Sequence, residues 1–173
     1  MEKETSTNST QNQVSTEKVN GGKFLTFFLQ NEEYGIEILR VQEIIGLMPI
    51  TRIPRTPDFV RGVINLRGKI IAVTDLRKKF GMEDIEQTSE TCIIVVQTNG
   101  TEIGVMVDKV SEVLDIADAE IEPTPAFGAS VPTEFLLGIG NTQGGVRLLL
   151  NIEKVLSDQQ LLEFTNEALS QMV

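Results

Sequence analysis

The chain has 173 residues, and its 15 Lys and Arg against 25 Asp and Glu give a formal net charge of −10. It contains no histidine, no tryptophan and a single cysteine. The lack of histidine excludes Ser-His-Asp and Cys-His relays and imidazole-bound zinc, and one cysteine allows no internal disulfide. The negative charge argues against binding to nucleic acid or to anionic membranes. With no signal peptide and no apolar run of membrane-spanning length, we expect a soluble cytoplasmic protein.

Residues 1–22 differ in composition from the rest of the chain. Twelve of them are Ser, Thr, Asn or Gln, and the only apolar side chains before the glycine pair are Met1, Val14 and Val19. Such a segment cannot bury enough surface to offset the entropy lost on ordering it. We therefore expect a disordered leader at residues 1–22.

From Phe24 onward, short apolar runs alternate with turn residues. The runs lie at residues 24–29, 34–38, 60–66, 69–76, 92–97, 102–107, 135–140 and 146–150. They are rich in Val and Ile and too short for helices, and the Asn99-Gly100 pair between two of them is a strong hairpin signal. The pattern predicts a mainly β protein, with residues 41–45 lying between strands.

Two helices are predicted in addition to the strands. Asp75 can cap a short helix that runs through Phe80. The segment that begins at Ser157 resembles a capping box and predicts a C-terminal amphipathic helix at about residues 158–171.

The chain repeats itself. A shift of 69 residues aligns residues 35–54 with 104–123, and a shift of 76 aligns residues 59–80 with 135–156, matching turn glycines, turn asparagines and apolar positions in the same order. The body is therefore predicted to be two copies of one unit of about five strands, at about residues 23–87 and 88–156.

A unit of this size is only marginally stable on its own, so we expect the two copies to share a core and to form a groove between them. Five short antiparallel strands tend to close into a small barrel. The prediction is two packed β-barrels with pseudo-two-fold symmetry, and the alternative is a single larger sandwich.

No motif for catalysis stands out. The acidic loop at residues 115–122 has carboxylates that could hold Mg²⁺ or Ca²⁺, but its spacing fits no EF-hand, and the glycine turns are not phosphate-binding loops. Cys92 opens a strand without a basic neighbour, which is typical of a core residue rather than a nucleophile. We expect neither enzyme activity nor a metal or cofactor.

Arg67 lies at the tip of a hairpin, beside Gly68, which permits the turn. Without further information it would be a solvated turn arginine. Arginine is nevertheless enriched at interface hot spots because it presents five donors in a rigid fork. We expect Glu43 to pair with Arg67 across the surface, with an effect on partner choice more than on folding.

Residues 33–44 and 61–77, continued by residues 104–114 and 150–156, resemble the CheW family of bacterial chemotaxis coupling proteins. The resemblance runs from about Phe24 to Phe164, so that residues 23–164 would form one CheW-like domain. It implies two intertwined, five-stranded SH3-like barrel subdomains. It also implies a non-enzymatic adaptor that joins the cytoplasmic tip of methyl-accepting chemotaxis receptors to the regulatory domain of the histidine kinase CheA, in arrays at the membrane.

The resemblance also assigns binding residues. The expected receptor-binding residues are Val41, Glu43, Ile44, Gly62, Arg67, Val110 and Val113. The expected kinase-binding residues are Ile50, Arg52, Ile53, Arg55 and Asn65. A receptor tip would insert apolar side chains into the groove between the barrels, with Arg67 as a polar anchor. The second copy reads Asn-Thr-Gln-Gly at residues 141–144 and has no arginine at the equivalent place, so the two faces are expected to bind different partners.

Three other functions fit parts of the sequence. A coupling module of the same fold could serve another receptor–kinase pathway, such as surface motility or development. A metal-dependent protein would use the acidic loop at residues 115–122. An oligonucleotide-binding barrel is disfavoured by the charge and by the small number of aromatic residues available for stacking on bases.

Overall fold

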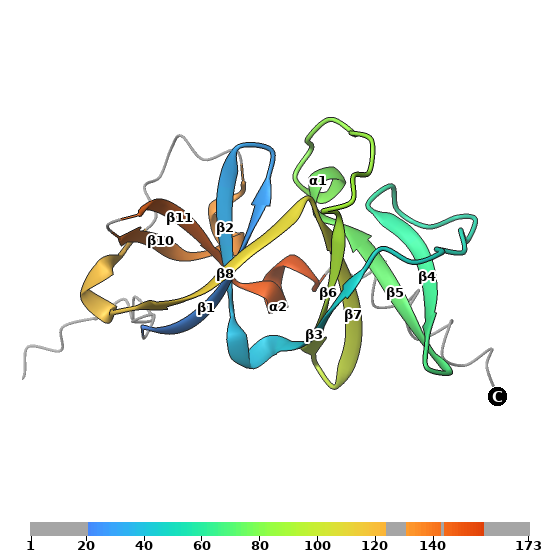
Figure 1. Ribbon diagram of the computed structural model, residues 1–173, viewed down its shortest axis with the longest axis horizontal. Coiled ribbons are helices and arrows are strands. Elements are labelled where there is room, and N and C mark those ends of the chain that lie inside the picture. The colour runs from blue at the N-terminus through green and yellow to red at the C-terminus, as the bar shows by residue number, and fades with distance from the viewer. Residues whose placement is uncertain (1–20, 124–130, 143, 158–173) are drawn as a thin grey trace, which may run out of the picture.

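The computed structural model describes residues 21–123, 131–142 and 144–157 (Figure 1). The strands are β1 (Gly22–Leu29), β2 (Glu32–Glu37), β3 (Val41–Gly46), β4 (Val60–Leu66), β5 (Lys69–Asp75), β6 (Cys92–Thr98), β7 (Thr101–Val107), β8 (Lys109–Ile116), β9 (Ile121–Glu122), β10 (Leu136–Thr142) and β11 (Gly145–Leu150). The helices are α1 (Leu76–Lys79) and α2 (Ile152–Val155), and three 3₁₀ turns are η1 (Ile38–Arg40), η2 (Asp118–Glu120) and η3 (Thr133–Phe135).

The strands form two sheets, which Figure 1 shows side by side with α2 between them. One sheet has six strands in the order β8-β1-β2-β11-β10-β9, and the other has five in the order β3-β6-β7-β5-β4. The expected mainly β fold with two SH3-like subdomains and few short helices is confirmed. Neither described helix is long or apolar enough to cross a membrane.

The two sheets do not follow the sequential division at residues 87 and 88. Strands β1 and β2 join the sheet of the second half, and β6 and β7 join the sheet of the first half. Each sheet thus combines the first two strands of one copy with the last strands of the other, an exchange that sequence similarity between the copies cannot reveal. The expected C-terminal helix and the leader up to residue 20 lie outside the described residues.

The strand register reproduces the sequence repeat. Gly35 on β2 pairs with Leu149 on β11, and Gly104 on β7 pairs with Val73 on β5, both in parallel ladders. Gly35 and Gly104 are equivalent under the 69-residue shift, and the other two residues are equivalent under the 76-residue shift. The pseudo-two-fold symmetry is therefore built into the hydrogen bonding as well as the sequence.

Three hydrophobic clusters explain how the barrels pack. The largest joins side chains of both sheets, among them Phe27, Tyr34 and Val96, in one shared core. A second cluster around Ile93 comes only from the five-stranded sheet, and a third around Phe24 comes only from the six-stranded sheet. Each barrel thus has an interior of its own in addition to the shared core, and the single-sandwich alternative is wrong.

The structure corrects several local expectations. Residues 41–46 form strand β3 instead of lying between strands, and β8 and α2 were not predicted. The short helix α1 has the predicted cap, because the Asp75 carboxylate accepts hydrogen bonds from the backbone N–H groups of Arg77 and Lys78. In α2 the equivalent capping residue is Asn151.

Candidate functional site

The hairpin between β4 and β5 presents Arg67 to solvent. Arg67 and Gly68 have φ angles of 53° and 84°, the left-handed pair that a two-residue hairpin turn requires. The side chain of Asn65 accepts a hydrogen bond from the Gly68 N–H at 2.8 Å and braces the turn. A non-glycine residue with positive φ is uncommon, and here it lies at an exposed hairpin tip.

Arg67 forms an ion pair with Glu43, as the sequence predicted. Glu43 lies on β3 and Arg67 follows β4, and these strands stand at opposite edges of the five-stranded sheet. The pair therefore spans the seam where the sheet curls upon itself. The Arg67 side chain is 71% exposed and that of Glu43 31%, so the ion pair contributes only about 0–1 kcal/mol to folding.

The four apolar receptor-binding candidates lie on the shared-core side of their strands. In the antiparallel ladders, Val41 and Ile44 stand opposite Val96 and Ile94, while Val110 and Val113 stand opposite Phe27 and Leu25. Residues directly opposite in such a ladder point to the same face, and all four partners belong to the shared core. Val41 and Val110 pack at its margin, whereas Ile44 and Val113 are 44% and 49% exposed.

Gly62 is a backbone element of the fold. It is buried with φ of 141°, and a Cβ at this position would lie 2.0 Å from the carbonyl oxygen of Thr51. Thr51 exchanges two backbone hydrogen bonds with the neighbouring Val63 at 2.8 and 2.9 Å, and this bridge closes the barrel. No side chain fits here, so a substitution such as Gly62→Asp would disturb folding and would not test binding alone.

The structure brings most of the kinase-binding candidates to one connection. Residues 50–55 lie between β3 and β4, and the Thr51 bridge holds this connection beside β4, the strand that contains Asn65. Arg52 and Arg55 are exposed. Ile50 and Ile53 instead pack against the barrel interior and the shared core respectively.

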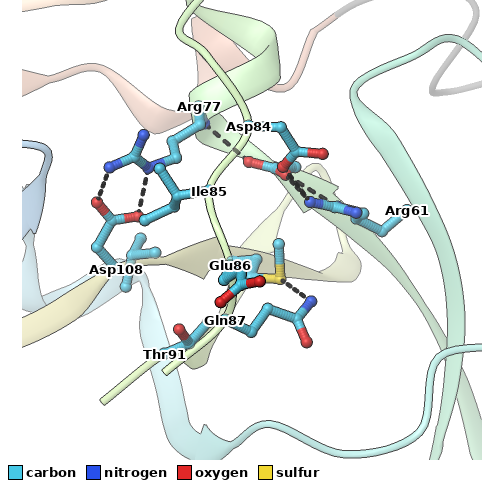
Figure 2. Close-up of a pocket in the computed structure, with 11 residues that line it drawn as sticks. Arg61, Arg77, Asp84, Ile85, Glu86, Gln87, Thr91 and Asp108 are labelled. Atoms are coloured by element: carbon cyan, nitrogen blue, oxygen red, sulfur yellow. Dashed lines mark hydrogen bonds and ion pairs between the residues drawn. The ribbon is translucent and has the colours of Figure 1, made fainter. Parts of the chain in front are cut away.

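Sequence reasoning missed a buried ionic cluster beside α1 (Figure 2). The Arg77 guanidinium donates to the Asp108 carboxylate through Nε at 2.7 Å and through Nη2 at 2.5 Å, and its third nitrogen donates to the Glu83 carbonyl at 2.9 Å. The Arg77 side chain is only 8% exposed. The hydrogen bond to Asp108 raises the pKa of Arg77 above its ordinary value.

Arg61 completes this cluster. Its guanidinium contacts the buried Asp75 carboxylate at 2.8 Å and Asp84 at 2.8 Å, which ties the segment after α1 to the barrel. The cluster lines a partly open cavity of about 20 Å³, with room for one water molecule. The sequence predicted Asp75 as a helix cap but not its ion pair with Arg61, and it predicted no partner for Asp108, because these pairings are set by tertiary topology.

The acidic loop directs its carboxylates to protein donors. Asp115 pairs with Lys23 at 3.2 Å, Asp118 accepts a hydrogen bond from the Gly21 N–H, and Glu120 accepts one from the Ala117 N–H. Within the described ranges, no group of three or more acidic, cysteine or histidine side chains converges on a possible metal position. Cys92 is partly buried against the shared core, and this burial raises the pKa of its thiol, so the thiolate is disfavoured.

Comparisons with known proteins agree with this architecture. Residues 23–160 match the family model described as the CheW-like domain. The chain is 43% identical over 150 residues to "Chemotaxis protein CheW" of Klebsiella aerogenes, covering 87% of this chain and 90% of that protein. It is 33% identical over 142 residues to "Chemotaxis protein CheW" of Rhizobium meliloti, covering 82% and 92%. The crystal structure of "scaffolding protein TtCheW" from Thermoanaerobacter tengcongensis matches with a TM-score of 0.74 and 36% identity, covering 81% of this chain and 90% of that one.

Proposed function

The chain belongs to the CheW family, and from this premise we infer that it is an adaptor that couples methyl-accepting chemotaxis receptors to the histidine kinase CheA. As a scaffold it would act through surfaces that hold two proteins together, without catalysis of its own. We place it in the cytoplasm, recruited to receptor arrays at the membrane. The finer assignments of partner to surface are proposals that rest on the geometry described above.

The conformation and exposure of Arg67 carry the proposal. Holding a non-glycine residue such as Arg67 in the left-handed region costs on the order of 1–3 kcal/mol. The exposed ion pair of Arg67 with Glu43 stabilises the fold by only about 0–1 kcal/mol. The arrangement therefore gives folding little or nothing. It does place a fixed guanidinium at the surface, which suits recognition of a partner.

The receptor surface that we propose consists of Val41, Glu43, Ile44, Arg67, Val110 and Val113. Ile44 and Val113 are equivalent in the repeat, and both expose about half of an apolar side chain beside the shared core. A helical hairpin at a receptor tip could bury its own apolar side chains against them, in the helix-in-groove mode. Gly62 would act indirectly, by closing the barrel that carries Arg67.

The kinase surface that we propose is the β3–β4 connection, with the exposed Arg52 and Arg55 as its polar contacts. Ile50 and Ile53 would shape the connection from beneath, because both pack inward. Asn65 would hold the adjoining hairpin turn through its bond to Gly68. The second barrel has no arginine equivalent to Arg67, which favours different partners for the two barrels.

The test combines co-sedimentation with a kinase assay. The purified chain, a receptor tip fragment and the kinase are mixed separately and together, and kinase activity is measured with and without receptor. We expect Arg67→Glu to change the free energy of unfolding by less than about 1 kcal/mol while receptor control of the kinase collapses. Lys69→Glu is the matched control, because Lys69 is an exposed base on the same hairpin that pairs with Glu102 at 3.3 Å.

Two results would contradict the proposal in different ways. Normal receptor control by folded Arg67→Glu protein would remove Arg67 from the receptor surface. Failure of the unmodified chain to recover receptor and kinase together would reject the adaptor function itself.

A further inference from the structure

Within the described residues, the chain passes between the two sheets at two places. It crosses from β2 to β3 through η1, and it crosses from β7 to β8 at Asp108. A short helix is attached to each crossover by an ion pair. Arg77 of α1 binds Asp108, and Glu153 of α2 binds Arg40 of η1 at 2.5 Å.

The sequence repeat relates one member of each ion pair, while the other two members are not equivalent. Residues 77 and 153 are equivalent under the 76-residue shift, but their charges are opposite. The two attachments also differ in strength. Arg77 and Asp108 are 8% and 19% exposed and share two hydrogen bonds, whereas Arg40 and Glu153 are 38% and 42% exposed.

Asp108 links both barrels at a single carboxylate. Besides binding Arg77, which lies in α1 directly after β5 of the five-stranded sheet, it accepts a hydrogen bond from the backbone N–H of Gln30 at 2.8 Å. Gln30 lies in the turn between β1 and β2 of the six-stranded sheet. The Asp108 N–H also donates to the Phe28 carbonyl at 3.2 Å. Both the backbone and the side chain of Asp108 are therefore bonded to the β1–β2 hairpin.

Aromatic stacking continues from the same helix. Phe80, directly after α1, stacks on Tyr34 of β2 with ring centroids 6.1 Å apart, and Tyr34 stacks on Phe27 of β1 at 5.9 Å. The end of α1 is thus fixed to the other sheet both by a buried ion pair and by a row of rings. A buried ion pair with two hydrogen bonds restricts the relative orientation of its two side chains more than an exposed ion pair does.

We propose that Arg77 is a positioning residue that fixes the orientation of the two barrels through Asp108, and that this fixed orientation carries coupling between the partners. The inference rests on the proposed function, in which the receptor surface takes residues from both sheets and the kinase surface lies on the five-stranded sheet alone. Coupling requires that the state of one partner change the free energy of contact with the other. If the two barrels reoriented freely, the parts of the receptor surface on the two sheets would not keep a fixed arrangement relative to the kinase surface, and little would be transmitted between the partners.

The experiment uses the full chain with Cys92→Ala and spin labels at Gln97→Cys and Ser111→Cys. These exposed positions lie on β6 and β8, in different sheets. Pulsed dipolar spectroscopy then gives the distribution of distances between the barrels. The test variant is Asp108→Asn, which keeps an acceptor for Gln30 but removes the charge, and the matched control is Glu153→Gln at the repeat-equivalent attachment.

We expect Asp108→Asn to broaden the distance distribution and to reduce the receptor-controlled change in kinase activity by about fivefold or more. Binding to the kinase, measured alone, should stay the same, because its proposed surface lies on the five-stranded sheet only. Glu153→Gln should leave the distribution and the coupling unchanged. If Asp108→Asn does not fold, Arg77→Lys replaces it, since lysine keeps the charge but lacks the second hydrogen bond.

An unchanged distribution would overturn the proposal, as would a broadened distribution with intact coupling. Equal effects of Asp108→Asn and Glu153→Gln would also overturn it, because the buried Arg77–Asp108 pair would then fix the barrel orientation no more than the exposed Arg40–Glu153 pair does. The distance measurement needs no partner. Failure of the unlabelled wild-type chain to bind receptor or kinase would therefore reject the proposed function and leave the result on barrel orientation standing.

Discussion

Gly62 and Arg67 belong to the same hairpin, and both have positive φ angles, but for different reasons. At Gly62 the backbone of Thr51 passes so closely that no Cβ can be accommodated. The Arg67 side chain is instead mostly exposed to solvent. The first residue is therefore required by packing, and the second is available to a partner.

We predict that Gly62→Ala lowers the free energy of unfolding by about 2–4 kcal/mol, because the new Cβ would clash with the Thr51 carbonyl and strain the backbone. Gly68→Ala is the control. Gly68 also has positive φ but open space around it, so only backbone strain of about 1 kcal/mol is expected. Urea denaturation measures both. Equal losses for the two variants would show that the contact with Thr51 is unimportant.

The residues that could be predicted from the sequence are those whose partners follow from local signals. The turn at Arg67 was evident from the glycine between two apolar runs, and an acid on the neighbouring segment suggested its pairing with Glu43. The pairing of Arg77 with Asp108 could not be predicted. These residues are 31 positions apart, and only the crossover between the sheets brings them together.

At the scale of elements, the repeat places α1 and α2 in equivalent positions with unequal caps. Asp75 caps α1 and also holds Arg61, and it is 1% exposed. Asn151 caps α2 through one hydrogen bond to the Lys154 N–H at 3.3 Å and is partly exposed. The sequence predicted α1 but not α2. It also missed β3, an edge strand in which exposed and partly buried residues alternate without a buried run.

We expect Asp75→Ala to destabilise the protein by about 2–4 kcal/mol, since it removes the cap of α1 and leaves the partly buried Arg61 without one of its two carboxylates. Asn151→Ala, at the equivalent position, should cost about 1 kcal/mol because only a cap is lost. Thermal or urea unfolding followed by circular dichroism distinguishes the two. A larger loss for Asn151→Ala would contradict the role given to the Asp75–Arg61 pair.

At the scale of the whole molecule, strand exchange ties the halves of the chain together. Sequence similarity between the copies predicted two units divided near residue 87, yet each sheet takes two strands from one half and its remaining strands from the other. The similarity is real, but it cannot indicate which copy of a strand pairs with which. In the fold, neither half of the chain holds a complete sheet or a complete share of the core.

We therefore predict that the fragments 1–87 and 88–173 are each unfolded when expressed alone and that an equimolar mixture regains β structure. The first fragment would have β1 and β2 without β8 and β11, and the second would have β6 and β7 without β3 and β5, so both would expose apolar faces that the other normally covers. Circular dichroism and amide hydrogen exchange on each fragment and on the mixture provide the test. For the intact chain, the same interdependence predicts one cooperative unfolding transition reported equally by probes in both sheets. A fragment that folds as a monomer with protected amides would show that one half closes its own barrel, and the exchanged pairing would then not be essential to the fold.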